Sequence, residues 1–361
     1  MSVRDVIIVG AGPSGLAAAI AAKQHDLDYQ VLEKGALVNS IYRFPPHMVF
    51  FTTPELLEIG GIPFVSPNDK PSRVEALRYY RKVVDTFDLQ IAFDEQVAGV
   101  KRDDAEGLFE IETHSSRGVR RVRLARHVIF AIGYYDHPVR LGIPGEELPH
   151  VSHYFGDPHL HYRQNVVIVG GGNSAAEAAL LLYRSGARVT LVHRHPTLKR
   201  TIKYWVRPDI ENRIKEGSIA ARFSAQIAEI RPTSVIVRAM TADVSDDEAQ
   251  RQRELFADAD ASHAPAAVIA AAQPAAETDE LAADAVYLLT GYRADTDLLC
   301  RAGVRLNDRE APAYDSQTFE TNVPNLFVAG GAIAGRDTGT VFIENGRFHG
   351  EKIIDVIARR T

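Results

Sequence analysis

The chain has 361 residues, of which 45% are hydrophobic and 24% charged, and its formal net charge at pH 7 is −6. This length and composition are typical of a globular protein with two domains of ordinary size. The negative charge and the lack of a long basic block argue against nucleic acid or an anionic membrane as a partner. No apolar run approaches the roughly 20 residues of a membrane helix. The chain enters an apolar strand at Val6 without a signal-peptide layout before it, so we expect a cytoplasmic protein.

The first motif lies between a buried strand, predicted over residues 6–9, and an Ala-rich helix. It has the form G-x-G-x-x-G. The first glycine permits a tight turn, the second lets the backbone approach a pyrophosphate, and the third lets helix and strand pack closely. The helix N-terminus then directs free N–H groups toward the phosphates. The predicted contacts with a dinucleotide come from Gly10, Gly12, Pro13, Ser14 and Gly15.

A carboxylate follows the second predicted strand of this unit, which covers residues 29–32 and ends at Glu33. An acid at this place accepts hydrogen bonds from a ribose 2′-hydroxyl. The first unit therefore suits an unphosphorylated ribose, and we predict that it binds FAD.

The same pattern recurs from Val166 as a strand, a G-x-G-x-x-A turn and a second Ala-rich helix. A repeated strand, turn and helix is much stronger evidence than a single glycine turn, because the motif requires that context. The residues expected at this second dinucleotide site are Gly170, Gly172, Asn173, Ser174 and Ala175.

The second unit has His193 where the first has Glu33, 23 positions after the first glycine of each turn. Arg194 follows His193, and Lys199 is nearby. Cations of this kind can bind a 2′-phosphate through charge-assisted hydrogen bonds. We therefore predict that the second unit binds NADPH through His193, Arg194 and Lys199. The alternative for the two cations is ordinary solvated surface charge.

Further segments fit a plan with two dinucleotide sites. Apolar strands are expected near residues 128–133, 286–292 and 321–331, and a helix is expected over 341–357. The predicted fold is α/β, with two Rossmann-like, three-layer dinucleotide-binding domains and the NADPH domain inserted in the FAD domain. The boundaries place residues 1–136 and 292–361 in the FAD domain and residues 137–291 in the NADPH domain.

One stretch of the second unit, about residues 243–282, is rich in Ala, Asp, Glu and Gln and poor in aromatic residues. Such a composition cannot bury much apolar surface. We predict a mobile surface insertion there, with a short surface helix as the alternative, and we assign it no chemistry.

The blocks at residues 33–42 and 342–350 resemble the YpdA-type bacillithiol-disulfide reductases, as do shorter blocks at 133–136, 153–155, 290–292 and 320–323. The glycine motifs alone are typical of the wider thioredoxin-reductase-like superfamily. The resemblance implies FAD, NADPH and reduction of the disulfide of a small cellular thiol. We also expect a homodimer or higher homo-oligomer. The further FAD contacts expected within family-like segments are Lys34, Asn39, Ser40, Gly133, Gly330, Gly331 and Ile343.

Two departures affect the mechanism. Bacillithiol-disulfide reductases usually carry a cysteine right after the Gly-Pro of the first motif, but this chain has Ser14, whose hydroxyl cannot form a mixed disulfide. Its only cysteine, Cys300, excludes a CxxC pair and a cysteine-based metal cluster. The catalytic group is therefore unassigned, with Ser14 and His349 as candidates, and no metal site is expected.

The acceptor of the electrons also stays open. The sequence is similar to thioredoxin-reductase-like ferredoxin/flavodoxin–NADP reductases, which share the fold and lack a CxxC pair. Electron transfer to a carrier protein is therefore the alternative to reduction of a small-molecule disulfide. A flavin redox sensor with low turnover is the third hypothesis.

Overall fold

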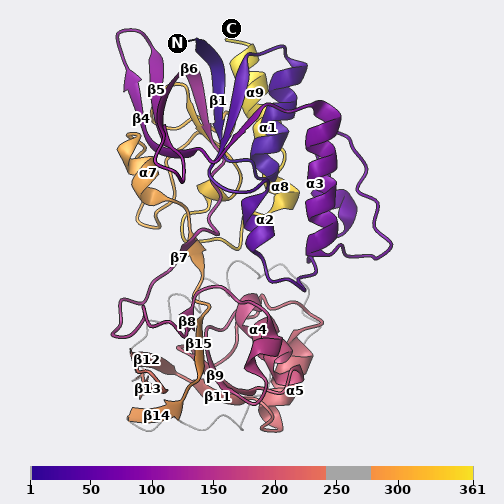
Figure 1. Cartoon of the computed structure of the whole chain (residues 1–361), viewed down its shortest axis with the longest axis vertical. Helices are drawn as coiled ribbons and strands as arrows, with labels where there is room; N and C mark the ends of the chain where they lie inside the picture. The colour runs from indigo at the N-terminus through magenta and orange to yellow at the C-terminus, as the bar shows by residue number, and fades with distance from the viewer. Residues whose placement is uncertain (1, 241–277, 361) are drawn as a thin grey trace. The chain divides into compact units, whose positions relative to one another are not determined.

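The computed structural model describes residues 2–240 and 278–360. The chain forms two compact units, and the second is inserted into the first. Residues 1–139 and 291–361 form unit 1, and residues 140–290 form unit 2 (Figure 1). No helix in these described ranges is long and apolar enough to cross a membrane.

Unit 1 is built on a sheet in the order β3-β2-β1-β6-β5-β4, with β17 also paired to β6. Strands β3, β2, β1, β6 and β17 are parallel, whereas β4 and β5 form antiparallel pairs. The first half of the long strand β6 pairs with β5, and its last residues pair with β17. The strands are β1 (Val3–Val9), β2 (Tyr29–Glu33), β3 (Ile91–Phe93), β4 (Gln96–Asp103), β5 (Leu108–His114), β6 (Arg120–Phe130) and β17 (Leu326–Val328).

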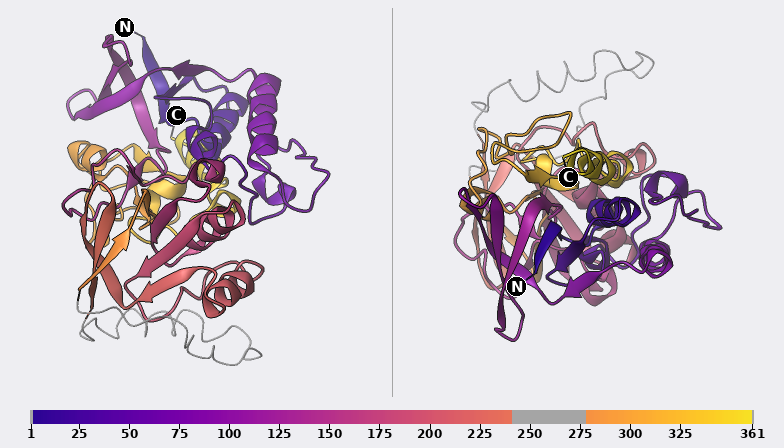
Figure 2. Two further views of the ribbon diagram at one scale, coloured as in Figure 1. Left: turned by 60° about the horizontal axis from the view of Figure 1, so that its bottom comes forward. Right: turned by 90° about the horizontal axis from the view of Figure 1, so that it is seen from above.

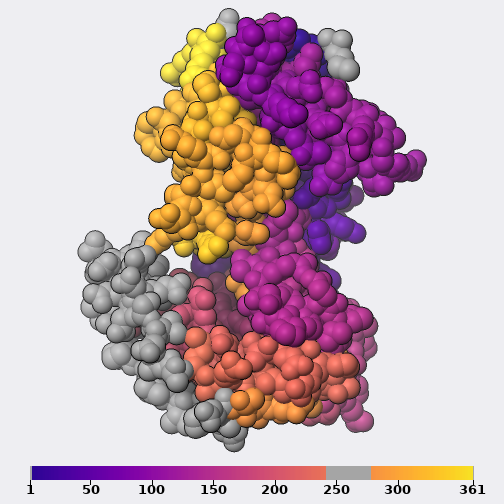
Figure 3. Space-filling view, turned by 90° about the vertical axis from the view of Figure 1, so that its left-hand side faces the viewer, coloured from indigo at the N-terminus to yellow at the C-terminus, as the bar shows by residue number. Residues whose placement is uncertain are grey.

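Side chains of the central strands alternate between two cores, as expected for a sheet covered on both faces. Ile8 packs in the core that includes residues of α1 (Pro13–Gln24), α3 (Arg73–Phe87) and α9 (His349–Ala358). Ile7 packs in the other core, which includes α7 (Thr296–Arg301). Unit 1 therefore has three layers, and α3 and the β4–β5 hairpin lie at opposite edges of it (Figure 2). Helix α7 packs against β4, and Figure 3 shows the orange part of unit 1, to which α7 belongs, beside purple residues of the same unit.

The helix expected over 341–357 is two helices, α8 (Ile343–Gly346) and α9. The interruption falls at Arg347 and Phe348, where the Phe348 N–H donates to the Asn345 carbonyl oxygen, only three residues back. The Arg347 guanidinium donates to the backbone oxygens of Glu55 and Glu58 at 2.9 and 2.5 Å. This long-range contact fixes the break, and helical periodicity alone gives no sign of it.

Unit 2 contains a parallel sheet in the order β11-β10-β9-β15-β8, with α4 (Asn173–Arg184) and α5 (Arg207–Lys215) packed in its core. A separate antiparallel sheet has the order β12-β13-β14. The strands are β8 (Val151–Ser152), β9 (Asn165–Val169), β10 (Arg188–His193), β11 (Ala220–Phe223), β12 (Ala225–Ile230), β13 (Ser234–Ala239), β14 (Thr278–Ala282) and β15 (Ala285–Leu288).

Strand β14 corrects the end of the predicted insertion. Residues 278–282 pair with β13 in antiparallel register, Leu281 packs against a core cluster, and the Asp279 carboxylate accepts a hydrogen bond from Arg222 at 3.0 Å. Composition over the wider window hid this short alternation of inward and outward residues. The remainder of the predicted insertion, residues 243–277, lies outside the described residues.

The two chain segments that connect the units pair with each other. β7 (His137–Pro138) and β16 (Tyr292–Arg293) form a short antiparallel ladder, and the Tyr135 and Tyr292 rings lie 4.5 Å apart between centroids. Both strands belong to unit 1.

Candidate functional site

Unit 1 has a pocket where the parallel strands β1, β2 and β6 end. Ligands of open α/β sheets bind outside the carboxyl ends of the strands. All residues predicted for FAD line this pocket except Gly15 and Gly330: they are Gly10, Gly12, Pro13, Ser14, Glu33, Lys34, Asn39, Ser40, Gly133, Gly331 and Ile343. Lining residues that sequence reasoning missed include Phe44, Glu95, Val97, Tyr134, Asp136 and Asp295.

The three glycines of the first turn are required for different reasons: two by the protein's own backbone and one by the space that a ligand would occupy. Gly10 has φ +106°, and a Cβ on it would lie 2.5 Å from the Ala131 carbonyl oxygen. A Cβ on Gly15 would lie 2.0 Å from the Gly10 carbonyl oxygen. Gly12 has φ −78° and ψ 175°, which any residue adopts, and a Cβ on it would meet nothing within 4 Å. The protein itself does not require a glycine there, so the open space fits the close approach of a pyrophosphate.

Glu33 lies at the end of β2 with only 5% of its surface exposed. Its Oε2 accepts a hydrogen bond from the Ala11 N–H, and its Oε1 accepts one from the Gly35 N–H, both at 2.8 Å. Burial raises the pKa of Glu33, and these two bonds partly offset that effect. Because each carboxylate oxygen has two acceptor positions, Glu33 can still accept from a ribose hydroxyl.

A charged cluster forms another wall of the pocket. The Asp136 carboxylate, 10% exposed, contacts Lys34 Nζ at 2.9 Å and Arg43 Nη1 at 3.2 Å. Lys34 and Asp136 both line the pocket, so this ion pair places a cation and an acceptor side by side on its wall.

Ser14 lies at the start of α1, close to two glycines from the C-terminal part of the chain. A Cβ on Gly330 would lie 2.3 Å from Ser14 Oγ, and a Cβ on Gly346 would lie 3.3 Å from it. Gly330 also has φ +60°. The Ser14 side chain therefore fills a space that only glycine neighbours leave free, at the edge of the pocket.

His349 contacts the same glycine. Its Nδ1 accepts a hydrogen bond from the Gly330 N–H at 3.1 Å, and its ring stacks on Phe319 with centroids 4.3 Å apart. Burial, and to a lesser degree the Lys352 charge, lower the pKa of His349 to about 4. At neutral pH the ring is therefore neutral, with its proton on Nε2. This geometry gives His349 a role in holding Gly330 and leaves its Nδ1 without a proton to donate.

The turn of unit 2 repeats the arrangement of unit 1. Gly170 has φ +149°, and a Cβ on it would lie 2.6 Å from the Leu289 carbonyl oxygen. A Cβ on Gly172 would meet only Lys199 Cδ, at 3.8 Å. Ala175 is buried and Ser174 is exposed. As at Gly12, the space beside Gly172 is open, and it fits the approach of a second dinucleotide.

The loop after β10 is tied to this turn. The Asn173 side chain accepts from the Lys203 N–H at 2.8 Å and donates to the Thr201 carbonyl oxygen at 3.1 Å. The Lys199 N–H donates to the Gly171 carbonyl oxygen at 2.9 Å. These bonds bring Lys199, predicted from sequence offset alone, next to the glycine turn.

His193 lies at the end of β10 with 5% of its surface exposed, and a Cβ on Gly171 would lie 2.3 Å from its Cε1 and Nε2. Its pKa is lowered to about 4, first by burial and then by the charges of His195, Lys199 and Arg194. His193 is therefore neutral at pH 7, and positive charge near this site comes from Arg194 and Lys199. The Arg194 Nε also donates to His195 Nε2 at 3.1 Å.

Comparison with known proteins agrees with this geometry. The sequence matches the pyridine nucleotide-disulphide oxidoreductase family over residues 7–258 and 260–330. Bacilliredoxin reductase Bdr of Bacillus subtilis (strain 168) is 38% identical over 356 residues, covering 98% of this chain and 97% of the relative. The solved structures of bacillithiol disulfide reductase Bdr (YpdA) from Bacillus cereus and Staphylococcus aureus are 36% and 34% identical, with TM-scores of 0.87 and 0.85, and each match covers 100% of both chains. The predicted fold class and resemblance are confirmed.

Proposed function

Because the chain belongs to the pyridine nucleotide-disulphide oxidoreductase family, we propose that it is an NADPH-dependent flavoenzyme that reduces a low-molecular-weight disulfide, specifically bacillithiol disulfide. Its cofactors are FAD and NADPH. The observation that carries the proposal is the pair of open glycine turns, one beside an acid and one beside two cations. The titles of the two solved structures, which call those proteins bacillithiol disulfide reductases, support bacillithiol disulfide as the substrate.

In this proposal, unit 1 holds FAD. The pyrophosphate lies against Gly12 and the N-terminus of α1, where free N–H groups and the helix dipole favour negative charge. Glu33 accepts from the ribose, and Lys34 adds positive charge to the pocket. The remaining contacts come from residues that line the pocket: Gly10, Pro13, Ser14, Asn39, Ser40, Gly133, Gly331 and Ile343. Gly15 and Gly330 do not line the pocket, and their role is to allow close packing of the backbone and of Ser14 next to it.

Unit 2 holds NADPH in the same manner. Gly172 admits the pyrophosphate, with Gly170, Asn173, Ser174 and Ala175 shaping the turn and the start of α4. Arg194 and Lys199 supply the charge for the 2′-phosphate, and neutral His193 packs beside Gly171. When both are bound, the cofactors supply the hydride and electron chemistry, and the protein supplies binding and orientation.

The overall reaction converts one disulfide, one NADPH and one proton into two thiols and NADP⁺. Ser14 replaces the thiol found in relatives, and the remaining cysteine, Cys300, is exposed on α7. A hydroxyl cannot attack sulfur as a thiolate does. We therefore propose that turnover requires no cysteine of this chain. A homodimer or higher homo-oligomer stays a prediction.

The decisive experiment measures anaerobic NADPH oxidation by the purified holoenzyme against bacillithiol disulfide, other small disulfides, ferredoxin and flavodoxin. We expect bacillithiol disulfide to be reduced with two thiols formed per NADPH. Reduction of a carrier protein without disulfide turnover would replace the proposal with a carrier reductase. Slow flavin reduction by NADPH with no acceptor turnover would indicate a redox sensor.

A further inference from the structure

The bend between β3 and β4 forms one wall of the FAD pocket. Glu95, Gln96 and Val97 line the same pocket as Glu33. The bend begins at Asp94, which has a left-handed backbone with φ +53°, and continues directly into β4 at Gln96. Its backbone path is therefore unusual for a non-glycine residue and has to be held by surrounding contacts.

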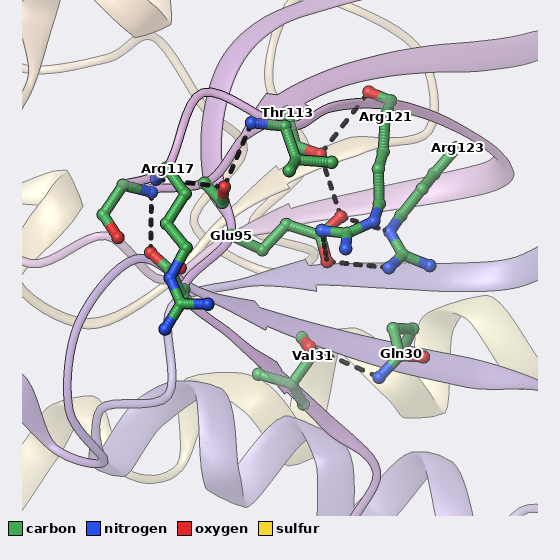
Figure 4. A network of polar contacts seen from close by, with 11 residues as sticks. Gln30, Val31, Glu95, Thr113, Arg117, Arg121 and Arg123 are labelled. Atoms are coloured by element: carbon green, nitrogen blue, oxygen red, sulfur yellow. Dashed lines mark hydrogen bonds and ion pairs between the residues drawn. The ribbon is translucent and has the colours of Figure 1, made fainter.

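The contacts converge on the Glu95 side chain, which is 1% exposed (Figure 4). Arg123 Nε donates to Oε1 at 2.6 Å, and Arg123 Nη2 donates to Oε2 at 2.7 Å. The Thr113 hydroxyl donates to Oε1 at 2.8 Å, and Arg121 Nη1 lies 4.0 Å from Oε2. Burial alone would raise the pKa of Glu95, but the bonds from Arg123 and Thr113 and the two arginine charges lower it.

The backbone of the bend is tied as well. The Glu95 N–H donates to the Glu33 carbonyl oxygen at 3.0 Å, and the Ser116 N–H donates to Asp94 Oδ1 at 2.7 Å. One end of the network is thus the residue that faces the ribose, and the other end lies on β5, on β6 and in the turn between them. Arg123 lies 28 positions from Glu95 in sequence and lines no part of the pocket.

The sheet order shows which part of the cofactor this wall faces. In a Rossmann-like unit the acid after the second strand contacts the adenosine ribose, and β3 is the next strand outward from β2. We propose that the Glu95–Arg123 pair is a positioning element for FAD, which fixes the wall of residues 95–97 beside Glu33 and thereby retains the adenosine half of the cofactor. This inference rests on the proposed function.

A purely structural ion pair is the alternative. The ladders of β4, β5 and β6 already join these strands, and Phe109 and Ile111 are fully buried in the adjoining core. Buried ion pairs are weak evidence for stability, since apolar replacements of both partners are often neutral. A positioning role and a structural role therefore differ when both partners are replaced.

The test compares FAD release from diluted holoenzyme, followed by the rise in flavin fluorescence. We expect Arg123→Met to release FAD roughly 10- to 100-fold faster, by analogy with metal sites, where removing a residue that orients a ligand weakens binding by this factor. Arg360→Met is the control for the loss of a two-bond arginine pair. Arg360 donates to Glu320 at 2.9 and 2.8 Å in unit 1, this pair is more exposed than Glu95–Arg123, and neither residue lines the pocket. Its release rate should match the unmutated protein.

The double variant Glu95→Leu/Arg123→Met removes the unpaired buried carboxylate that could prevent folding of the single variant. We expect it to recover thermal stability and still to release FAD fast, and saturating FAD should restore its rate of reduction by NADPH. Release of FAD from the double variant at the unmutated rate would overturn the inference, whatever the rate of the single variant. Unmutated protein that binds no FAD would instead overturn the proposed function.

Discussion

The variant Gly12→Ala tests whether glycine is required at position 12 for FAD binding or for folding. Gly12 has φ −78° and ψ 175°, and a Cβ on it would have no neighbour within 4 Å. Alanine therefore fits the free protein without strain. It even removes some freedom from the unfolded chain, which stabilises a protein by about 0.4–1 kcal/mol at a compatible position.

The unfavourable effect of the alanine methyl group is expected on the free energy of FAD binding. A methyl group in a space that a pyrophosphate must enter is an overpacking defect, for which about 1–3 kcal/mol is typical. Since 1.4 kcal/mol is a factor of ten, we expect the FAD dissociation constant to rise roughly 5- to 150-fold. The free energy of unfolding in the absence of FAD should be unchanged or slightly higher.

Three further glycines provide the controls. Gly172→Ala makes the same change in unit 2, so it should keep bound flavin and raise the KM for NADPH. Gly156→Ala, where a Cβ also meets nothing within 4 Å, should change neither the flavin content nor the KM for NADPH. Gly15→Ala should lower the free energy of unfolding even without FAD, because its Cβ would lie 2.0 Å from the Gly10 carbonyl oxygen unless the backbone shifts.

The assay is flavin content after gel filtration, with FAD affinity from fluorescence titration and stability from urea unfolding without FAD. Gly12→Ala that binds FAD as tightly as the unmutated protein would refute the assignment of this space to the pyrophosphate. A lower free energy of unfolding for Gly12→Ala than for the unmutated protein, both without FAD, would show that the protein itself requires glycine at position 12.

The remaining predictions concern unit 2, the cysteine and pH. Gly171→Ala should raise the KM for NADPH about tenfold by displacing the His193 ring, and His193→Ser in the same chain should restore it, measured by steady-state kinetics. Arg194→Ala should reduce the ratio of kcat/KM for NADPH to kcat/KM for NADH by roughly tenfold or more, since a charge-assisted bond contributes about 1.5–3 kcal/mol. Equal use of both coenzymes by the unmutated protein would contradict this. Cys300→Ser should keep both flavin reduction and disulfide turnover, and loss of the second alone would identify Cys300 as the nucleophile. The pKa values of His193 and His349 are about 4 when folded and 6.5 by default, so the unfolded chain binds more protons between these values. The free energy of unfolding should therefore fall as pH drops from about 6.5 to about 4, by about 3 kcal/mol for His193. In His349→Asn the amide oxygen can replace Nδ1 as the acceptor. This variant should show a smaller change of unfolding free energy with pH, measured by urea unfolding.

Local stereochemistry explains which parts of the site could be predicted from sequence. The tight turns at Gly10 and Gly170 need positive φ, and the open positions at Gly12 and Gly172 follow two residues later in the same motif. Glu33 is placed by a short strand whose end is visible in the hydrophobic pattern. These features depend on residues within about 25 positions of each other, so a linear reading captures them.

Long-range contacts explain what could not be predicted. The Glu95 wall depends on an arginine of β6, which is 28 positions away in sequence. The Asp136 cluster depends on Lys34 and Arg43, which are more than 90 positions before Asp136. The neutral state of His349 depends on burial, which its sequence neighbours do not reveal. Each of these needs the register of the sheet before the partner is known.

The two units also show that the second residue of the turn and the residue after the second strand are physically coupled. In unit 1 the Glu33 carboxylate accepts from the Ala11 N–H, and the methyl group of Ala11 is fully buried without conflict. In unit 2 the wider imidazole of His193 occupies the space of a Cβ, so only glycine fits at position 171. A neutral ring at position 193 adds no negative charge of its own beside Arg194 and Lys199, which suits a 2′-phosphate better than an acid at this position would. A histidine at position 33 would therefore need glycine in place of Ala11, whereas an acid at position 193 could accept from the Gly171 N–H as Glu33 accepts from the Ala11 N–H.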